Sequence, residues 1–167
     1  MRPAALDGRR LAASRSLAGE LRLEWFEATW GEGMRTRGYR AVDAAGVEWR
    51  EADLEDVGVL SIRVAGVTHR RAALQAAGFE PGEPAILMPE PDNPHDPFAL
   101  GVRDLSLAAQ AGYVPATRSR ALVEEMARRP LHALMLSEHR EAAPGGARVG
   151  LRVLASFSPL LESRNEG

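Results

Sequence analysis

Residues 89–102 read PEPDNPHDPFALGV, and this stretch decides how the centre of the chain folds. Its four prolines exclude a helix and remove backbone donors that an internal strand needs. Asp92 and Asn93 favour Asx turns, in which the side chain bonds the backbone that follows it. The stretch therefore predicts a rigid, preformed loop that leads directly into a strand, FALGV.

Short alternating or apolar runs on both sides of this loop are typical of strands. Strands are predicted at 59–67, 85–88, 98–104, 107–114, 131–139 and 147–157. Two short helices are expected between them, one over 68–78 that ends at Gly78 and one over 116–129 that follows Pro115 and stops before Pro130. The whole pattern predicts a compact fold, either a mainly β barrel or an α+β domain.

The first third of the chain is interpreted as an extension, residues 1–57, that precedes a main domain at 58–160 and a loose tail at 161–167. Helix and strand patterns compete over 16–30, so that stretch is a weak element of either type. Residues 39–58 alternate with period two on either side of DAAG, which predicts a β-hairpin with Trp49 in the core.

Composition excludes several classes of protein. Hydrophobic residues make up 45% of the chain and charged residues 26%, as in folded globular proteins. The absence of cysteine excludes disulfides, thiolate metal sites and a cysteine nucleophile. No run approaches the roughly 18 apolar residues of a membrane span, so we expect a soluble cytoplasmic protein with no membrane partner. A net charge of −2 argues against a large basic face that coats nucleic acid, although a local basic pocket stays open.

Motifs for catalysis are missing from the sequence. It contains no P-loop, no dinucleotide fingerprint and no convincing pairing of a nucleophile with a base. Asp92, His95 and Asp96 are metal-ligand types, but neighbouring side chains in a proline loop rarely converge on one ion. We therefore predict that the chain is not an enzyme and uses neither a metal nor a cofactor.

Four motifs in a fixed order resemble the HIRAN domain: VAGVTHR, GFEPGEP, EPDNPHDPFALGV and AGYVP before a helix. The likeness spans roughly residues 58–130 and implies an OB-like β-barrel that binds the free 3′ end of single-stranded DNA. The resulting hypothesis is a DNA-binding module that acts in repair, replication or restriction, with single-stranded DNA and a DNA-processing enzyme as partners. The alternative is a protein-interaction adaptor that keeps the barrel without DNA affinity.

The resemblance also implies which residues contact DNA. In the proline loop, His95 would stack on a terminal base, Asp96 would accept a hydrogen bond from the 3′ hydroxyl, and Asn93 would hold the loop. The remaining members are expected to line the same groove or to hold phosphates: His69, Arg70, Arg71, Tyr113 and Arg118. The DNA-binding members have tyrosine where this chain has His69 and His95, whose smaller rings offer less stacking area.

Each of these residues also has a purely structural interpretation. The two histidines could be ordinary polar loop residues, and Asp96 could simply cap a turn. Arg70 and Arg71 could be the solvated start of a helix, and Tyr113 could belong to the core. The sequence leaves both interpretations open for every member of the set.

Overall fold

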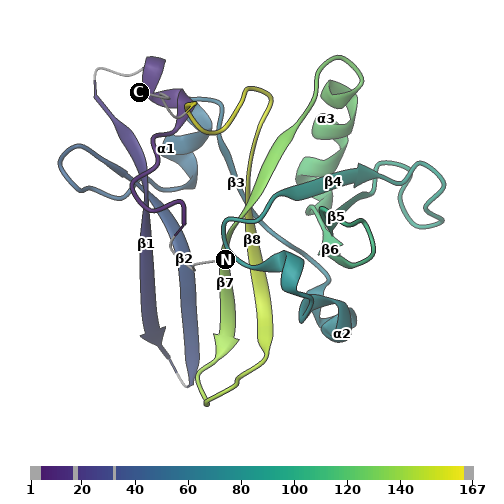
Figure 1. The fold of residues 1–167 in the computed structure, drawn as a ribbon. Coiled ribbons are helices and arrows are strands. Elements are labelled where there is room, and N and C mark those ends of the chain that lie inside the picture. The colour runs from purple at the N-terminus through teal and green to yellow at the C-terminus, as the bar shows by residue number, and fades with distance from the viewer. Residues whose placement is uncertain (1–4, 17–18, 32, 164–167) are drawn as a thin grey trace.

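The computed structural model describes residues 5–16, 19–31 and 33–163, which form two antiparallel sheets and several short helices (Figure 1). The larger sheet has the order β1-β2-β7-β8-β3, with strands β1 (Leu21–Trp30), β2 (Met34–Asp43), β7 (His132–Glu141), β8 (Arg148–Ser156) and β3 (Leu60–Arg63). The smaller sheet has the order β4-β5-β6, with strands β4 (Ala85–Pro89), β5 (Leu100–Asp104) and β6 (Gln110–Tyr113). The six predicted strands of the main domain are all present.

The helical segments connect the strands. They are η1 (Ala12–Ser16), α1 (Glu51–Asp56), η2 (Val67–His69), α2 (Arg71–Leu74), η3 (Ala77–Phe79) and α3 (Ala116–Met126). The helix predicted over 68–78 is therefore broken into three single turns, and Gly78 lies inside the last of them. The helix predicted after Pro115 is confirmed, because α3 begins at the next residue.

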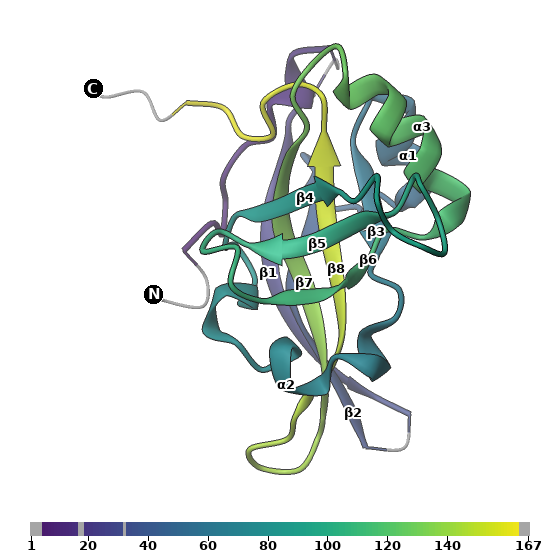
Figure 2. The same cartoon turned by 90° about the vertical axis from the view of Figure 1, so that its right-hand side faces the viewer.

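The smaller sheet packs across the larger one, so that its strands run nearly at right angles to β7 and β8 (Figure 2). Single bridges connect both edges of the small sheet to the large one. Pro84, just before β4, pairs with Leu134 of β7, and Ala65, just after β3, pairs with Tyr113 of β6. The predicted mainly β, OB-like fold is confirmed, with the two sheets joined by these bridges instead of by continuous ladders.

The main core lies between the two sheets. Ile62, Phe79, Leu100, Met135 and Val153 are all at most 2% exposed there and come from both layers. Burying one such side chain contributes roughly 1.5–3 kcal/mol to folding. The alternation read from the sequence is therefore the pattern of a two-layer β structure.

The N-terminal extension adds a long hairpin to the large sheet. β1 and β2 pair from Leu21 with Asp43 to Trp30 with Met34, and β2 then pairs with β7. Most of the stretch 16–30, whose pattern fitted both a helix and a strand, thus forms strand β1. A second apolar cluster, which includes Leu23 and Leu154, packs this extension against the large sheet.

The hairpin predicted around DAAG is only partly correct. The chain does turn back there, because the Asp43 carboxylate accepts hydrogen bonds from two backbone amides of the turn. Pairing ends after the bridge between Val42 and Glu48, and residues 51–56 form helix α1 where a strand was predicted. Trp49 is half-buried against the second cluster.

A buried ion network anchors the segment that carries η2 and α2. Glu138 is completely buried and pairs with Arg37, Arg140 and Arg148. Burial alone would raise the pKa of Glu138, but its bonds to the three guanidinium groups outweigh burial and hold the pKa below its usual value. Arg148, 1% exposed, also donates to the carbonyl of Leu74 at the end of α2, to the carbonyl of Ala76 just after it, and to Glu80 at 2.8 Å.

The tail predicted at 161–167 lies partly outside the described residues, which end at 163. Within the described part, Leu161 forms a bridge with Leu11, and the backbone amide of Glu162 bonds the carbonyl of Arg10. The division of the chain into an extension and a main domain at residue 57 stays a prediction.

Candidate nucleic-acid interface

The proline loop is held by its own polar side chains. The Asn93 Oδ1 atom accepts hydrogen bonds from the amides of His95 at 2.9 Å and Asp96 at 3.2 Å. The Asp96 Oδ1 atom in turn accepts from the Phe98 amide at 2.8 Å. These are the Asx turns that the sequence predicts, and they leave the second carboxylate oxygen of Asp96 without a hydrogen-bond partner among the described residues.

Glu90 ties this loop to strand β6, a role that the sequence interpretation missed. Its carboxylate accepts hydrogen bonds from the Tyr113 hydroxyl at 3.1 Å, from Gln110 at 3.2 Å and from Asn93 at 3.4 Å. Gly101 makes room for it, because a Cβ atom there would lie 2.7 Å from a Glu90 oxygen. Its position one residue before the second proline gives no signal of these partners.

A surface hollow of about 310 Å³ opens between the loop and the end of β6. Four of the eight predicted site residues line it: Asn93, His95, Asp96 and Tyr113. The remaining lining comes from the residues that follow β3 and β6, from the residue before β5 and from the start of α3: Ala65, Gly66, Ala99, Val114, Pro115 and Ala116. The hollow therefore combines an exposed imidazole, a carboxylate and a phenol with a small apolar floor.

Arg70 lies beside this hollow and contacts Tyr113. Its Nη2 atom donates to the Tyr113 hydroxyl at 3.3 Å, and its Cζ atom lies 5.4 Å from the centre of the ring. The Tyr113 hydroxyl thus accepts from Arg70 and donates to Glu90. This chain of contacts fixes the ring and places a positive charge next to the hollow.

The other three predicted residues lie apart from the hollow. His69 is exposed at the end of η2, and Arg71 lines a separate hollow of about 290 Å³ behind α2. Arg118 forms a bidentate ion pair with Glu55 of α1, with N–O distances of 3.0 and 3.2 Å. That bond raises the pKa of Arg118 and lowers the pKa of Glu55. Arg118 therefore links α3 to the N-terminal extension.

Arg63 is a basic residue near the hollow that the sequence interpretation overlooked. Val64 is buried in the core, so its neighbours Arg63 and Ala65 point to the opposite side, and Ala65 lines the hollow. No carboxylate among the described residues lies within ion-pair distance of Arg63. The alternation of VLSIRVAGV carried this signal, because it puts the arginine on the outward face.

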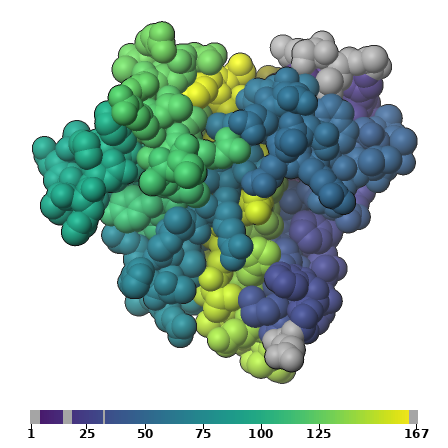
Figure 3. Space-filling model, turned by 180° about the vertical axis from the view of Figure 1, so that it is seen from behind, coloured from purple at the N-terminus to yellow at the C-terminus, as the bar shows by residue number. Residues whose placement is uncertain are grey.

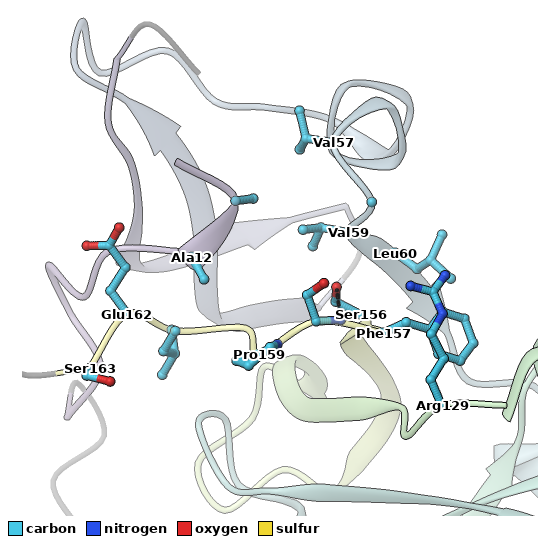
Figure 4. A pocket seen from close by; sticks show the side chains of 14 residues that line it. Ala12, Val57, Val59, Leu60, Arg129, Ser156, Phe157, Pro159, Glu162 and Ser163 are labelled. Carbon is cyan, nitrogen blue, oxygen red and sulfur yellow. Dashed lines mark hydrogen bonds between the residues drawn. The ribbon is translucent and has the colours of Figure 1, made fainter. Parts of the chain in front are cut away.

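A larger hollow of about 640 Å³ lies where the end of α1 meets the C-terminal segment (Figure 4). Its walls are mostly apolar and include Val57, Val59 and Phe157, whose ring is covered by the Arg129 guanidinium at 4.7 Å. None of the predicted site residues lines it. The smaller hollow at the proline loop is therefore the candidate site.

Within residues 5–16, 19–31 and 33–163, no three His, Asp or Glu side chains gather as metal ligands would. In the same part of the chain, no helix has both the length and the apolar character that a membrane crossing requires.

Comparison with protein families decides the relationship. The model of the HIRAN domain family matches residues 57–158, which is more than half of the chain. The chain belongs to the HIRAN family. HIRAN domains bind DNA and have no catalytic activity of their own, so membership supports DNA binding in general.

Among solved structures, the chain is similar to the crystal structure of the HIRAN domain of human HLTF, at 19% identity and a TM-score of 0.43. That match covers 59% of this chain and 74% of the other. No curated protein sequence matches the chain.

Proposed function

We propose that this chain binds single-stranded DNA at its free 3′-hydroxyl end. The observation that carries the proposal is the hollow at the proline loop, which gathers Asn93, His95, Asp96 and Tyr113 around one opening. Its volume of about 310 Å³ suits the end of a strand, one or two nucleotides, better than a long helical segment. A site of that size needs few phosphate contacts, in keeping with the low net charge.

Asp96 is the residue that would distinguish a 3′ hydroxyl from a 3′ phosphate at the end of the strand. One of its oxygens is used by the Phe98 amide, which fixes the carboxylate in place, and the other has no partner among the described residues. A carboxylate accepts a hydrogen bond from a 3′ hydroxyl, whereas it repels a 3′ phosphate. Charged hydrogen bonds of this kind contribute about 1.5–3 kcal/mol, or roughly 10-fold to 150-fold in affinity.

Ring faces and arginines would supply the rest of the binding energy. The exposed His95 ring is available for stacking on a base, which is tolerant of sequence because every base has a flat face. Arg70 and Arg63 lie beside the hollow without a carboxylate partner among the described residues, so they are the two cations placed to hold phosphates.

The biological context we propose is DNA repair, replication or restriction. A module that reads an end and has no catalytic machinery would recruit a DNA-processing enzyme to that end. This assignment rests on the family and on the proposed end recognition.

The test is fluorescence anisotropy of a short 5′-labelled strand that ends in either a 3′ hydroxyl or a 3′ phosphate. We expect the hydroxyl form to bind about 10-fold more tightly or better. Asp96→Asn keeps an oxygen for the Phe98 amide but replaces the free oxygen by a donor, so it should abolish the preference.

Asp92→Asn is the matched control, since Asp92 is exposed in the same loop and does not line the hollow. It removes the same charge and should keep the preference. An Asp96→Asn protein that still prefers the hydroxyl would contradict the assigned role. A folded wild-type protein that binds neither end would instead favour the adaptor function.

A further inference from the structure

A polar row crosses the large sheet beyond the candidate site. Arg63 on β3 pairs with Arg152 on β8, Arg152 pairs with Ser137 on β7, and Ser137 pairs with Gly38 on β2. Figure 3 shows this side of the molecule, where β8 (yellow) and β7 (light green) reach the surface between β3 and the β1–β2 hairpin, below α1. The row spans three strand spacings, about 14 Å at roughly 4.8 Å each.

The two arginines of this row face each other directly, which is unfavourable for like charges in a sheet. Arg152 is compensated by Glu51 at 2.8 Å and by the Ser61 hydroxyl at 3.2 Å. Arg63 has no ion-pair partner among the described residues. The Arg63–Arg152 pair therefore carries an excess of positive charge, which an anionic ligand would neutralise.

On β1 the row reaches Phe26, which pairs with Gly38. Four residues further along the same face of β1, the Trp30 side chain is held in place by hydrogen bonds. The Trp30 indole donates to the Thr36 hydroxyl at 2.7 Å, and that hydroxyl lies 2.6 Å from Nδ1 of His139. The Thr36 hydroxyl thus accepts from Trp30 and shares a second hydrogen bond with His139, which a neutral imidazole can form in either tautomer. Burial and then the charges of Arg63 and Arg152 lower the pKa of His139, which fits this neutral form.

Trp30 itself is 53% exposed, although its indole nitrogen is satisfied and its ring packs edge-on against His139 at 6.0 Å. An ordered, half-exposed indole offers a flat apolar face to solvent. A flat face on a surface that also carries arginines is the arrangement with which proteins bind single strands without reading their sequence.

A hollow of about 340 Å³ lies along this row. Its lining includes the hydroxyls of Ser61 and Ser137, the imidazole of His139 and the guanidinium groups of Arg40, Arg50 and Arg152, and Glu48 and Glu51 line it as acids. Glu51 is already paired with Arg152. The lining can therefore bond the oxygens of a phosphate that approaches along the sheet.

The row is continuous with the candidate site. Ser61, Arg63 and Ala65 share one side of the β3 segment, and Ala65 lines the hollow at the proline loop. A strand whose 3′ end occupies that hollow therefore meets Arg63 first and Arg152 next as it leaves along the sheet.

We propose that the same DNA single strand continues from the hollow across this face, with its phosphates held by Arg63 and Arg152 and a base stacked on Trp30. This inference rests on the proposed function and deepens it, because Trp30 and the rest of the hairpin lie outside the residues that match the family. The extension thereby adds a second, sequence-tolerant contact to an end-binding module.

The test compares two strands with free 3′ hydroxyls, of about 4 and about 12 nucleotides, both within the usual range of site sizes of OB-type domains. We expect the wild-type protein to bind the longer strand more tightly. Trp30→Ala should weaken binding of the longer strand at least about fivefold, the lower limit for one stacked base, and leave the shorter strand unchanged.

Arg152→Ala should reduce the salt dependence for the longer strand by about one unit of slope. Trp30→Phe keeps a stacking ring, so it should retain most of the wild-type preference for the longer strand over the shorter one. The control Arg128→Ala removes a charge from an exposed side chain just after the end of α3, and should change the affinity for neither strand.

Two results would overturn the inference. If both strands bind the wild type equally, the sheet face contacts no DNA, while binding of the shorter strand keeps the end-reading function intact. If Trp30→Ala lowers the affinity for both strands equally, the indole does not act as a separate contact for the longer strand. If the wild-type protein binds neither strand, the proposed function is contradicted as well.

Discussion

Replacing Arg148 by methionine tests whether the buried ion network positions the segment beside the candidate site. Arg148 is 1% exposed, and its guanidinium bonds the carbonyls of Leu74 at 2.6 Å and Ala76 at 3.1 Å. It also bonds Glu80 at 2.8 Å and the fully buried Glu138. The substitution leaves carbonyls and part of a buried carboxylate without their donor.

The expected cost follows from that geometry. Removing one partner of a buried charged pair costs about 3–5 kcal/mol, because the other group stays buried without compensation. For a chain of this size each kcal/mol lowers the melting temperature by about 2–4 °C, so the variant should melt roughly 6–20 °C lower. The total stability of such domains is only about 5–15 kcal/mol, so Arg148→Met should be visibly compromised.

The assay is thermal unfolding by circular dichroism, together with urea unfolding. The slope of the unfolding free energy against urea concentration should be the same in the variant and the wild type. Arg128→Ala serves as the control, since its ion pair with Glu125 is exposed and should contribute at most about 1 kcal/mol. The double variant Arg148→Met, Glu138→Leu should recover part of the loss, because it removes the buried charge as well. A loss of less than about 1 kcal/mol in Arg148→Met would refute the reasoning.

Two further predictions concern charge. The folded-state pKa of Glu138 lies below its unfolded value, so its stabilisation is complete above the unfolded pKa of about 4.3 and is lost as the pH falls through the folded pKa. Urea unfolding from neutral to acid pH should therefore lose stability more steeply in the wild type than in Glu138→Gln, and parallel curves would contradict this. Glu55→Ala releases Arg118, so single-strand affinity at low salt should rise about fivefold and the salt slope should steepen by about one unit. Unchanged anisotropy at every salt concentration would place Arg118 outside the interface.

Local patterns determined much of this protein before any tertiary information was needed. Alternation located the strands of the main domain, because it reflects one buried and one exposed face. Proline and asparagine predicted the rigid loop, since their effects act within three or four residues of the backbone, and Pro115 placed the start of α3. Asn93, His95, Asp96 and Tyr113 could be named because the motif keeps them together.

Other features were decided only when distant segments met. Residues 51–56 alternate like a strand, yet they form a helix that contacts β3. Glu90 joins Asn93 of its own loop to Gln110 and Tyr113 of β6, and Arg118 is paired with Glu55 in the extension, 63 residues away. The pairing of Arg63 with Arg152 depends on strand register across the sheet. Sequence alone fixes which face a residue occupies, whereas its charged and polar partners depend on long-range pairing that no local pattern encodes.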